Sequence, residues 1–257
     1  MFVAAASALQ QIVAAVQRRA MSKSMENDDK RAAAVAAVAE VRGGMLVGLG
    51  TGSTAAFAIR ALGGMVADGL TIRAVATSLA SEALARSAGI DVVDLATVDF
   101  AAGMMIDLTI DGADEIAPDC TAIKGAGGAM LREKIVAAAS RRMVVVADGS
   151  KRVARLGAAP LPVEVLPFAR RFAGAQLAER FARVTLRGGD ADPYLTDNRN
   201  IVFDCHDILR GSWPDLATAL SAIPGVVGHG LFLTEVDAAY IASGGIVTRV
   251  ERDGSSG

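Results

Sequence analysis

The first half of the chain alternates short apolar runs with amphipathic segments. Residues 27–42 carry Val35, Val38 and Val41 on one face at helical spacing, and Gly43 follows as a stop, which predicts a helix. Nearly uniform apolar runs predict buried strands at 45–49, 71–76, 90–95, 104–110 and 143–147, with helices between them at about 54–66, 80–88 and 128–142. This alternation predicts an α/β fold with a parallel sheet that is covered on both faces.

The pattern changes near residues 159–162, which read Ala-Pro-Leu-Pro. Beyond them we expect strands at 163–166, 183–187, 200–205, 226–233, 237–241 and 246–250, with helices at about 168–182 and 214–222. Two helices among several strands predict a smaller α+β domain with an antiparallel sheet. The pattern leaves open whether the last one or two strands return to the first domain.

Composition narrows the possible functions. The 257 residues, 52% of them hydrophobic, are enough for one large or two small domains with a buried core. The 26 basic and 28 acidic residues nearly cancel, so we expect neither nucleic acid nor a membrane as partner. Two cysteines and two histidines argue against a disulfide framework and a zinc site and favour a reducing, cytoplasmic location. No apolar run reaches about 18 residues without a charge, so no transmembrane span is expected.

The two ends of the chain differ from the rest. Residues 1–25 are rich in alanine, carry Arg18, Arg19 and Lys23, and hold no acidic residue before Glu26. This composition is compatible with an organelle-targeting segment and with an N-terminal extension that is loosely ordered or helical. Residues 253–257 are expected to form a flexible tail.

A glycine-hydroxyl loop, Gly48-Leu49-Gly50-Thr51-Gly52-Ser53-Thr54, lies between a predicted strand and a predicted helix. Glycine allows close approach to a ligand, and a helix start offers unpaired N–H groups, so the loop is a candidate phosphate site. The dinucleotide fingerprint needs a third glycine where Ser53 stands, and the nucleoside-triphosphate loop needs a lysine that is missing. The loop therefore fits a phosphate monoester better than a nucleotide.

Three more polar segments follow later strands. Asp111-Gly112-Ala113-Asp114-Glu115 brings three carboxylates to the end of a predicted strand, where open α/β sheets bind ligands. A solvated acidic turn or a magnesium site is the alternative for this segment. Lys124-Gly125-Ala126-Gly127-Gly128 opens a helix that contains Arg132-Glu133-Lys134, and Asp148-Gly149-Ser150-Lys151 follows the next apolar strand. Acids and ammonium groups that converge on a phosphate loop indicate acid–base chemistry on a small sugar phosphate.

At these residues the chain resembles ribose-5-phosphate isomerase of type A, over about residues 26–251. The resemblance is carried by the four segments above and by Pro160-Leu161-Pro162-Val163-Glu164-Val165 and Thr196-Asp197-Asn198. Ala126 interrupts a loop that is usually an unbroken glycine run in this family. The resemblance implies that ribose 5-phosphate and ribulose 5-phosphate are interconverted without metal or organic cofactor.

The resemblance also implies an architecture. It indicates a Rossmann-like catalytic domain over residues 26–158 and about 236–252, and a smaller ferredoxin-like α+β domain over residues 159–235. It further implies a homodimer or homotetramer. The catalytic candidates it implies are Glu133 as the base, with Asp111, Asp114 and Lys124 around the sugar. The substrate-binding candidates are Lys30, Thr51, Gly52, Ser53, Thr54, Gly125 and Lys151.

The residue types suit aldose–ketose isomerisation. One carboxylate, Glu133, can move a proton between C2 and C1, and partial burial should raise its pKa toward neutrality. Lys124 can stabilise the charge that develops on the enediolate oxygens. Asp111 or Asp114 can move a hydroxyl proton or assist opening of the furanose ring, and the sequence does not divide these tasks.

Two other functions fit part of the pattern. Related folds serve as non-catalytic sugar-phosphate sensors, but a sensor of that kind needs a DNA-binding module that we do not find here. Acyl-CoA transfer would need a nucleophilic glutamate, and amino-sugar-phosphate deamination usually uses a histidine. His206 and His229 lie outside the polar segments, and Cys120 and Cys205 are expected to be a bystander and a core residue.

Overall fold

The computed structural model describes residues 22–209 and 211–253. The expectations for residues 1–21 and for the tail at 254–257 lie outside these described residues. Residues 22–25 belong to a helix that is described over residues 22–38, so this helix extends further toward the N-terminus than the predicted start at residue 27. No helix in the described ranges is both long and apolar enough to cross a membrane.

The largest sheet has seven strands in the order β14-β13-β7-β4-β1-β2-β3. Its strands are β1 (Leu46–Leu49), β2 (Arg73–Ala76), β3 (Asp91–Val92), β4 (Leu108–Gly112), β7 (Met143–Asp148), β13 (Ala238–Ser243) and β14 (Ile246–Glu251). Neighbouring strands are parallel, except that β14 runs antiparallel to β13. Counted along the chain, the six parallel strands follow the 3-2-1-4-5-6 order of the Rossmann fold. The predicted parallel sheet is confirmed, and both C-terminal strands join it.

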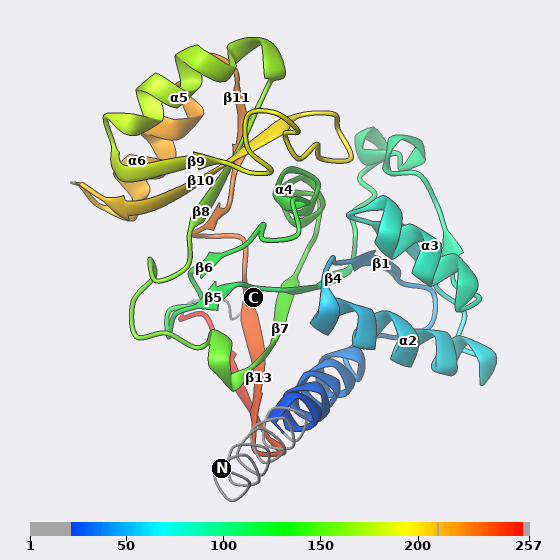
Figure 1. The fold of residues 1–257 in the computed structure, drawn as a ribbon. Helices are drawn as coiled ribbons and strands as arrows, with labels where there is room; N and C mark the ends of the chain where they lie inside the picture. Colours follow the sequence, from blue (N-terminus) through cyan, green and yellow to red (C-terminus); the bar gives the residue numbers. More distant parts are fainter. Residues whose placement is uncertain (1–21, 210, 254–257) are drawn as a thin grey trace, which may run out of the picture.

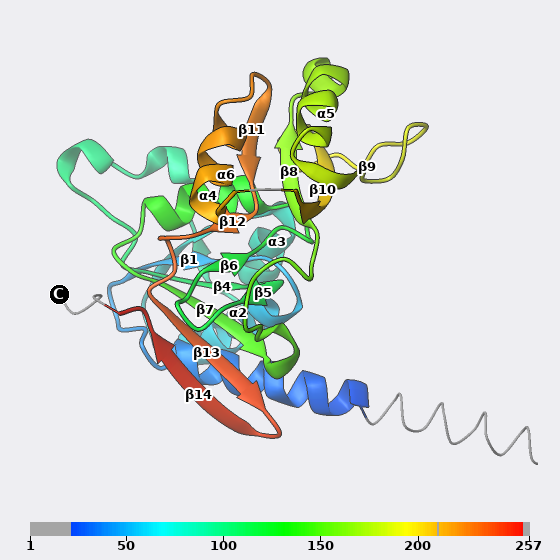
Figure 2. The same cartoon turned by 90° about the vertical axis from the view of Figure 1, so that its left-hand side faces the viewer.

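Helices cover this sheet on both faces (Figure 1). They are the helix at 22–38, α2 (Ser53–Ala67), α3 (Leu79–Ser87) and α4 (Met130–Ala138). The helix at 22–38 and the turn after it contribute Ala33, Ala34, Ala37, Val38 and Val41 to the same buried cluster as β1 and α2. Figure 2 shows this helix crossing behind β13 and β14, and Asp29 accepts hydrogen bonds from the Gly244 and Gly245 amides between those strands. The helix is thereby fixed beside the large sheet.

The second sheet has four antiparallel strands in the order β11-β8-β10-β9. Its elements follow one another as β8 (Leu161–Val165), α5 (Arg170–Ala178), β9 (Phe181–Leu186), β10 (Ile201–Ile208), α6 (Trp213–Ser221) and β11 (Val226–His229). This βαββαβ order is ferredoxin-like, as the resemblance implied. Figure 1 shows α4 between this sheet and the large one.

A small three-stranded sheet, β12-β6-β5, was not expected from the sequence. Its strands are β5 (Glu115–Ile116), β6 (Ala122–Ile123) and β12 (Leu231–Phe232). β12 lies within the strand predicted at 226–233, whereas β5 and β6 have only two residues each, which is too short to show an alternating pattern. Within the described residues there are also four 3-10 turns, at η1 (Leu95–Thr97), η2 (Phe100–Ala102), η3 (Gly149–Lys151) and η4 (Pro167–Ala169).

The predicted element at 128–142 is shorter in the structure. The helix α4 ends at Ala138, because the residues after it pair with the segment that leads into β4. The Ile106 amide donates to the Ala139 carbonyl at 3.0 Å, and the Thr109 amide donates to the Arg142 carbonyl at 2.8 Å. The strand predicted at 104–110 correspondingly begins later, at Leu108, and continues to Gly112. Asp111 is therefore a strand residue with a fixed backbone.

Candidate active site

The polar segments meet where the strand order of the large sheet reverses. β1 and β4 are neighbours there, and their connections leave in opposite directions, which opens a crevice at the carboxyl ends of the strands. The glycine-hydroxyl loop follows β1, and Asp111 lies near the end of β4. A Cβ atom on Gly50 would come within 2.1 Å of the Asp111 Oδ1 atom, so only glycine allows this approach.

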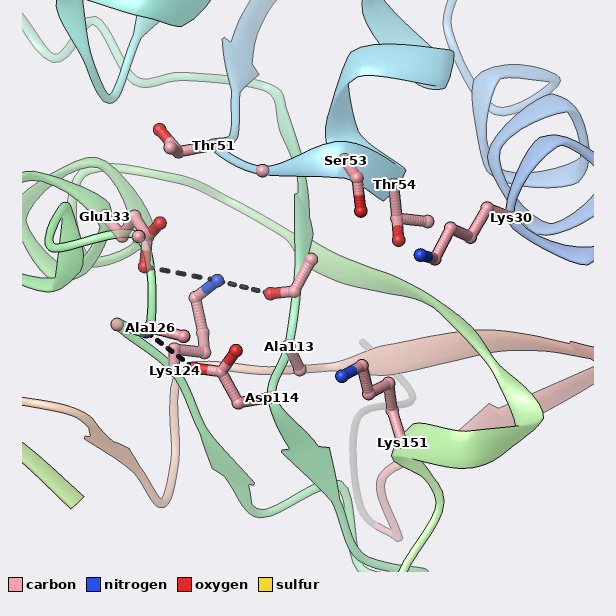
Figure 3. A pocket seen from close by; sticks show the side chains of 14 residues that line it. Lys30, Thr51, Ser53, Thr54, Ala113, Asp114, Lys124, Ala126, Glu133 and Lys151 are labelled. Atoms are coloured by element: carbon pink, nitrogen blue, oxygen red, sulfur yellow. Dashed lines mark hydrogen bonds and ion pairs between the residues drawn. The ribbon is translucent and has the colours of Figure 1, made fainter. Parts of the chain in front are cut away.

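A cavity of about 220 Å³ opens at this point. Figure 3 shows it with the glycine-hydroxyl loop on one side, Glu133 at one end, and two lysines at the other end. Its walls are formed by residues of the N-terminal helix, the glycine-hydroxyl loop, the end of β4, the lysine loop, α4 and η3. The lining residues are Lys30, Thr51, Gly52, Ser53, Thr54, Gly112, Ala113, Asp114, Lys124, Gly125, Ala126, Gly127, Glu133 and Lys151.

The start of α2 faces the cavity with its backbone amides. Gly52 precedes the helix at φ 106°, a conformation that glycine adopts without strain, and no side chain caps the first turn. The unpaired N–H groups and the helix dipole favour an anion at this position. Figure 3 shows the Ser53 and Thr54 side chains directed toward the cavity. These features form the anion-binding end of the site.

Thr51, a predicted substrate-binding residue, lines the cavity, but its hydroxyl already has partners in the protein. Its Oγ1 atom lies 2.8 Å from both Thr77 Oγ1 and Ser78 Oγ, and its backbone amide donates to Asp111 Oδ1 at 3.0 Å. Figure 3 shows the side chain turned away from the lysines. Thr51 therefore fixes the loop to the start of α3 and to β4, and its hydroxyl is already engaged.

Two lysines face the start of α2. Lys30, on the N-terminal helix, is buried and pairs with Glu26, and its Nζ atom lies 3.9 Å from Asp148 Oδ2. Lys151, in η3, has no carboxylate within 4 Å among residues 22–209 and 211–253. Figure 3 shows the Lys30 ammonium group directed toward Thr54 and the Lys151 ammonium group directed into the cavity toward Ala113. Asp148, which the sequence placed only in a loop, also orders η3 by accepting from the Ser150 amide at 2.9 Å.

The other end of the cavity holds a buried ammonium group between two carboxylates. Lys124 Nζ lies 3.0 Å from Asp111 Oδ2 and 3.2 Å from Glu133 Oε2, and it also donates to the Gly112 carbonyl. The three side chains are almost fully buried, at 0% exposure for Asp111, 2% for Lys124 and 4% for Glu133. Asp111 does not line the cavity but lies behind Lys124. The structure thus separates Asp111 from Asp114, which the sequence could not do.

Burial sets the protonation behaviour of this group. Burial, together with the negative charge of Asp111, raises the pKa of Glu133 to about 8, although Lys124 opposes the shift. Burial also raises the pKa of Asp111 against the opposing charge of Lys124. For Lys124, burial alone would lower the pKa, but attraction to Asp111 and Glu133 outweighs it and raises the pKa. A carboxyl group with a pKa near neutrality can both take and return a proton.

Asp114 lies on the cavity wall next to the lysine loop. Its Oδ2 atom accepts a hydrogen bond from the Ala126 amide at 2.8 Å, which Figure 3 shows as a dashed line. In this loop the positive φ angles belong to Gly125 and Gly128, not to Ala126. The alanine that interrupts the glycine run therefore stands without backbone strain, and its amide orients the carboxylate.

The third carboxylate of the acidic segment does not join the site. Glu115 faces away from the cavity, and its two oxygens accept from the Gly157 and Ala159 amides.

The two histidines do not line the cavity either. His229 is buried, and burial and Lys134 lower its pKa to about 4. His206 also lies outside the lining. Among residues 22–209 and 211–253 no group of three or more histidine, cysteine or acidic side chains is arranged to hold a metal ion.

The segment that holds the catalytic candidates matches a known protein family. The family model of ribose 5-phosphate isomerase A (phosphoriboisomerase A) matches residues 73–245, which include the acidic segment, the lysine loop and α4. The chain belongs to this family. The ribose-5-phosphate isomerase A of Sphingopyxis alaskensis is 51% identical over 221 residues, which are 85% of this chain and 94% of the relative. That of Nitrobacter hamburgensis is 46% identical over 233 residues, or 87% of this chain and 97% of the relative.

Solved structures of the family have the same fold. The crystal structure of ribose 5 phosphate isomerase A from Neisseria gonorrhoeae superposes with a TM-score of 0.81 at 36% identity, covering 88% of this chain and 97% of that chain. A D-ribose-5-phosphate isomerase in complex with phospho-erythronic acid superposes with a TM-score of 0.80 at 34% identity, covering 87% and 97%. The family membership and the α/β fold expected from the sequence are both confirmed.

Proposed function

We propose that this chain interconverts D-ribose 5-phosphate and D-ribulose 5-phosphate through an enediolate intermediate. The observation that carries the proposal is the buried Asp111–Lys124–Glu133 group at one end of a cavity whose other end is a helix start flanked by lysines. A pentose 5-phosphate has its phosphate at one end and its reacting carbons at the other, and it matches this arrangement. A relative named as the same isomerase is 51% identical.

In the proposed reaction Glu133 is the base. It takes the proton from C2 of the open-chain aldose, and the electron pair of the C–H bond forms the C1–C2 double bond while the carbonyl electrons move to O1. After the O2 hydroxyl proton has moved to O1, the same carboxyl group returns its proton to C1, and C2 becomes the ketone. A pKa of about 8 suits a group that both accepts and donates a proton near neutral pH.

Lys124 is proposed to stabilise the negative charge that develops on O1 and O2. Its ammonium group is held by Asp111 and by the Gly112 carbonyl before substrate arrives, so little reorganisation is needed during the reaction. The raised pKa keeps this group charged throughout the neutral range. Burial strengthens the interaction with the enediolate because little water screens it.

We assign the two aspartates different tasks. Asp114 lines the cavity, so it is the carboxylate that can move the hydroxyl proton between O2 and O1 or assist ring opening. Asp111 is buried behind Lys124, and both of its oxygens are occupied by that ammonium group and by the Thr51 and Gly112 amides. Asp111 is therefore proposed to hold Lys124 in position and not to touch the substrate.

The phosphate group is proposed to bind at the start of α2. The backbone amides after Gly52, the Ser53 and Thr54 hydroxyls, and the Lys30 and Lys151 ammonium groups supply its donors. Lys30 already points toward Thr54 while it pairs with Glu26, so a phosphate bound there can share its ammonium group. Gly125 lines the cavity with its backbone. Its φ of 109° favours glycine, and a Cβ atom there would come within 3.0 Å of the Met130 side chain.

Three further expectations from the sequence are part of this proposal. The division into a Rossmann-like domain (26–158 with 236–252) and a small domain (159–235) is supported by the two separate sheets. A homodimer or homotetramer, and a cytoplasmic location, are proposed from the resemblance and from the cysteine usage. Cys120 and Cys205 are both free and buried, which agrees with a reducing compartment.

A coupled assay of the purified protein with ribose 5-phosphate, in the presence of a chelator, tests the proposal. Formation of ribulose 5-phosphate at a steady rate is expected. Binding of the sugar phosphate without turnover would instead identify a sensor, which was the alternative considered from the sequence. Activity that appears only when a divalent metal is added would contradict a mechanism based on Glu133 and Lys124 alone.

A further inference from the structure

The four-stranded sheet contacts the active site without lining it. The whole cavity wall comes from residues 30–151, yet the connection between β9 and β10 reaches the lysine loop at residues 124–128. Arg187 and Tyr194 donate to backbone carbonyls of that loop, and Asn198 accepts a hydrogen bond from Arg132 of α4 at 2.8 Å. This connection also includes the Thr196-Asp197-Asn198 motif, which the proposed chemistry leaves without a role.

Arg187 makes the most extensive of these contacts. Its Nη1 atom donates to the carbonyl oxygens of Gly125 and Ala126, both at 3.1 Å. The other side of the guanidinium group is fixed by Asp204 of β10, which accepts from Nε at 3.0 Å and from Nη2. The Arg187 side chain is mostly buried. The planar guanidinium group of Arg187 is thus held on one edge by the Asp204 carboxylate, and its other edge, which we call the Arg187 fork, donates to the carbonyls of Gly125 and Ala126.

The Gly125–Ala126 peptide connects this fork to a cavity-lining carboxylate. Its carbonyl oxygen accepts from Arg187, and its N–H group donates to Asp114 Oδ2 at 2.8 Å. A trans peptide is planar, with its C=O and N–H groups pointing in opposite directions, so fixing the carbonyl also fixes the direction of the N–H group. The guanidinium charge polarises the same peptide and strengthens its donation to a carboxylate.

The lysine loop needs an external contact to hold one conformation. The loop carries Gly125 at φ 109° and Gly128 at φ 78°, and glycine-rich backbone has many conformations available to it. Without an external contact, the Ala126 amide would sample directions that do not meet Asp114. Tyr194 adds a second restraint by donating to the Gly127 carbonyl at 3.1 Å.

We propose that Arg187 is a positioning residue for the isomerase reaction, which orients Asp114 through the Gly125–Ala126 peptide. This inference rests on the proposed function, because it assigns Asp114 a role in moving hydroxyl protons of the sugar. It also gives the four-stranded sheet a task in catalysis, although none of its side chains lines the cavity.

The test is a double-mutant cycle between Arg187→Lys and Asp114→Asn, with ribose 5-phosphate as substrate. Lysine keeps the charge but cannot bridge two carbonyls and a carboxylate, so kcat should fall about tenfold or more while KM changes less than about threefold. In the Asp114→Asn background the same Arg187 change should have almost no further effect on kcat, because it acts through Asp114. Asp204→Asn weakens the contact that holds the Arg187 guanidinium group, so it should lower kcat by less than Arg187→Lys does. Combined with Arg187→Lys, it should lower kcat no further.

Arg183→Lys is the matched control. Arg183 lies on β9, four residues before Arg187, is exposed, and makes no ion pair within residues 22–209 and 211–253, so its variant should keep the parental kcat. A parent protein that does not isomerise ribose 5-phosphate would overturn the proposed function itself. A second result is that the parent isomerises ribose 5-phosphate while the two single losses in kcat, from Arg187→Lys and from Asp114→Asn, multiply in the double variant. That result would overturn only the role of Arg187. If Arg187→Lys does not fold, the Asp204→Asn cycle with Asp114→Asn decides the question by the same criterion.

Discussion

Replacing Asp111 by asparagine should move the pH at which the enzyme becomes active. Glu133 must be ionised to act as the base, so kcat should rise with pH through the pKa of this group, which is about 8 in the parent. Burial is the largest cause of that raised value, and the negative charge of Asp111 is the next. Asp111→Asn removes this second cause and keeps nearly the same side-chain shape.

The size of the shift follows from the geometry. Asp111 and Glu133 each contact the same Lys124 nitrogen, at 3.0 and 3.2 Å, so their nearest oxygens are at most about 6 Å apart. Two unit charges at that distance repel by about 3 kcal/mol at an effective dielectric constant of about 20. Since one pKa unit corresponds to about 1.4 kcal/mol, the pKa of Glu133 should fall by about 2 units. The midpoint should therefore move from near pH 8 to near pH 6.

The assay is kcat for ribose 5-phosphate between pH 5.5 and 9.5, for the parent and for Asp111→Asn. The quantity kcat is suitable because it reports ionisation in the enzyme–substrate complex, whereas the free substrate's own phosphate group titrates at about pH 6. The plateau value of kcat should also be lower in the variant. Lys124 then loses one of its two buried carboxylate partners, although it keeps Glu133 and the Gly112 carbonyl.

Two results would contradict the claim that the charge of Asp111 raises the pKa of Glu133. An ascending limb that stays near pH 8 in Asp111→Asn would mean that the charge of Asp111 does not act on the base. A limb that moves to higher pH would mean that Asp111 supports the ionised form of Glu133, which is the opposite of repulsion between two carboxylates. Melting temperature measured in parallel shows whether the variant is folded.

Three further changes test other parts of the site. Changing both Ser53 and Thr54 to alanine should raise KM at least tenfold with a smaller effect on kcat, since charge-assisted hydrogen bonds contribute about 1.5–3 kcal/mol each; an unchanged KM would place the phosphate elsewhere. Lys151→Gln should also raise KM and weaken competitive inhibition by inorganic phosphate, which an inhibition assay measures. A chain that begins at Ser22 should keep the parental kcat in the coupled assay, because the site residues all follow that point; a loss of activity would show that residues 1–21 contribute to the active protein.

Much of the fold could be predicted from the sequence because the large sheet is built from short, uniformly apolar strands. The runs at Met143–Asp148 and Leu46–Leu49 are buried on both sides, so their pattern is unambiguous. The small sheet was not predicted because β5 and β6 have two residues each, and β12 was expected only as part of a longer strand at 226–233. The end of α4 was misplaced because residues 139–142 are held by pairing with the segment around Ile106, a contact that no local pattern encodes.

The sequence predicted which residues belong to the site better than it predicted what each of them does. The sequence motifs identified Glu133, Lys124 and Asp114, and in the structure all three line one cavity. The orientation of a side chain depends on distant partners. The sequence therefore did not show that the Thr51 hydroxyl contacts Thr77, or that Glu115 of the acidic segment accepts from the Gly157 amide. The contact of Arg187 with the lysine loop spans about sixty residues of sequence and left no local signal.

The most direct test of the account is proton transfer by Glu133. Deuterium at C2 of ribose 5-phosphate should be lost to solvent or transferred to C1 by the parent, and NMR of the products measures both outcomes. Glu133→Gln should fold and bind the sugar phosphate, with kcat lower by about 10²–10⁴-fold and with neither loss nor transfer of deuterium. Near-parental isomerisation and deuterium loss in Glu133→Gln would contradict the account and assign the base to another carboxylate of the cavity.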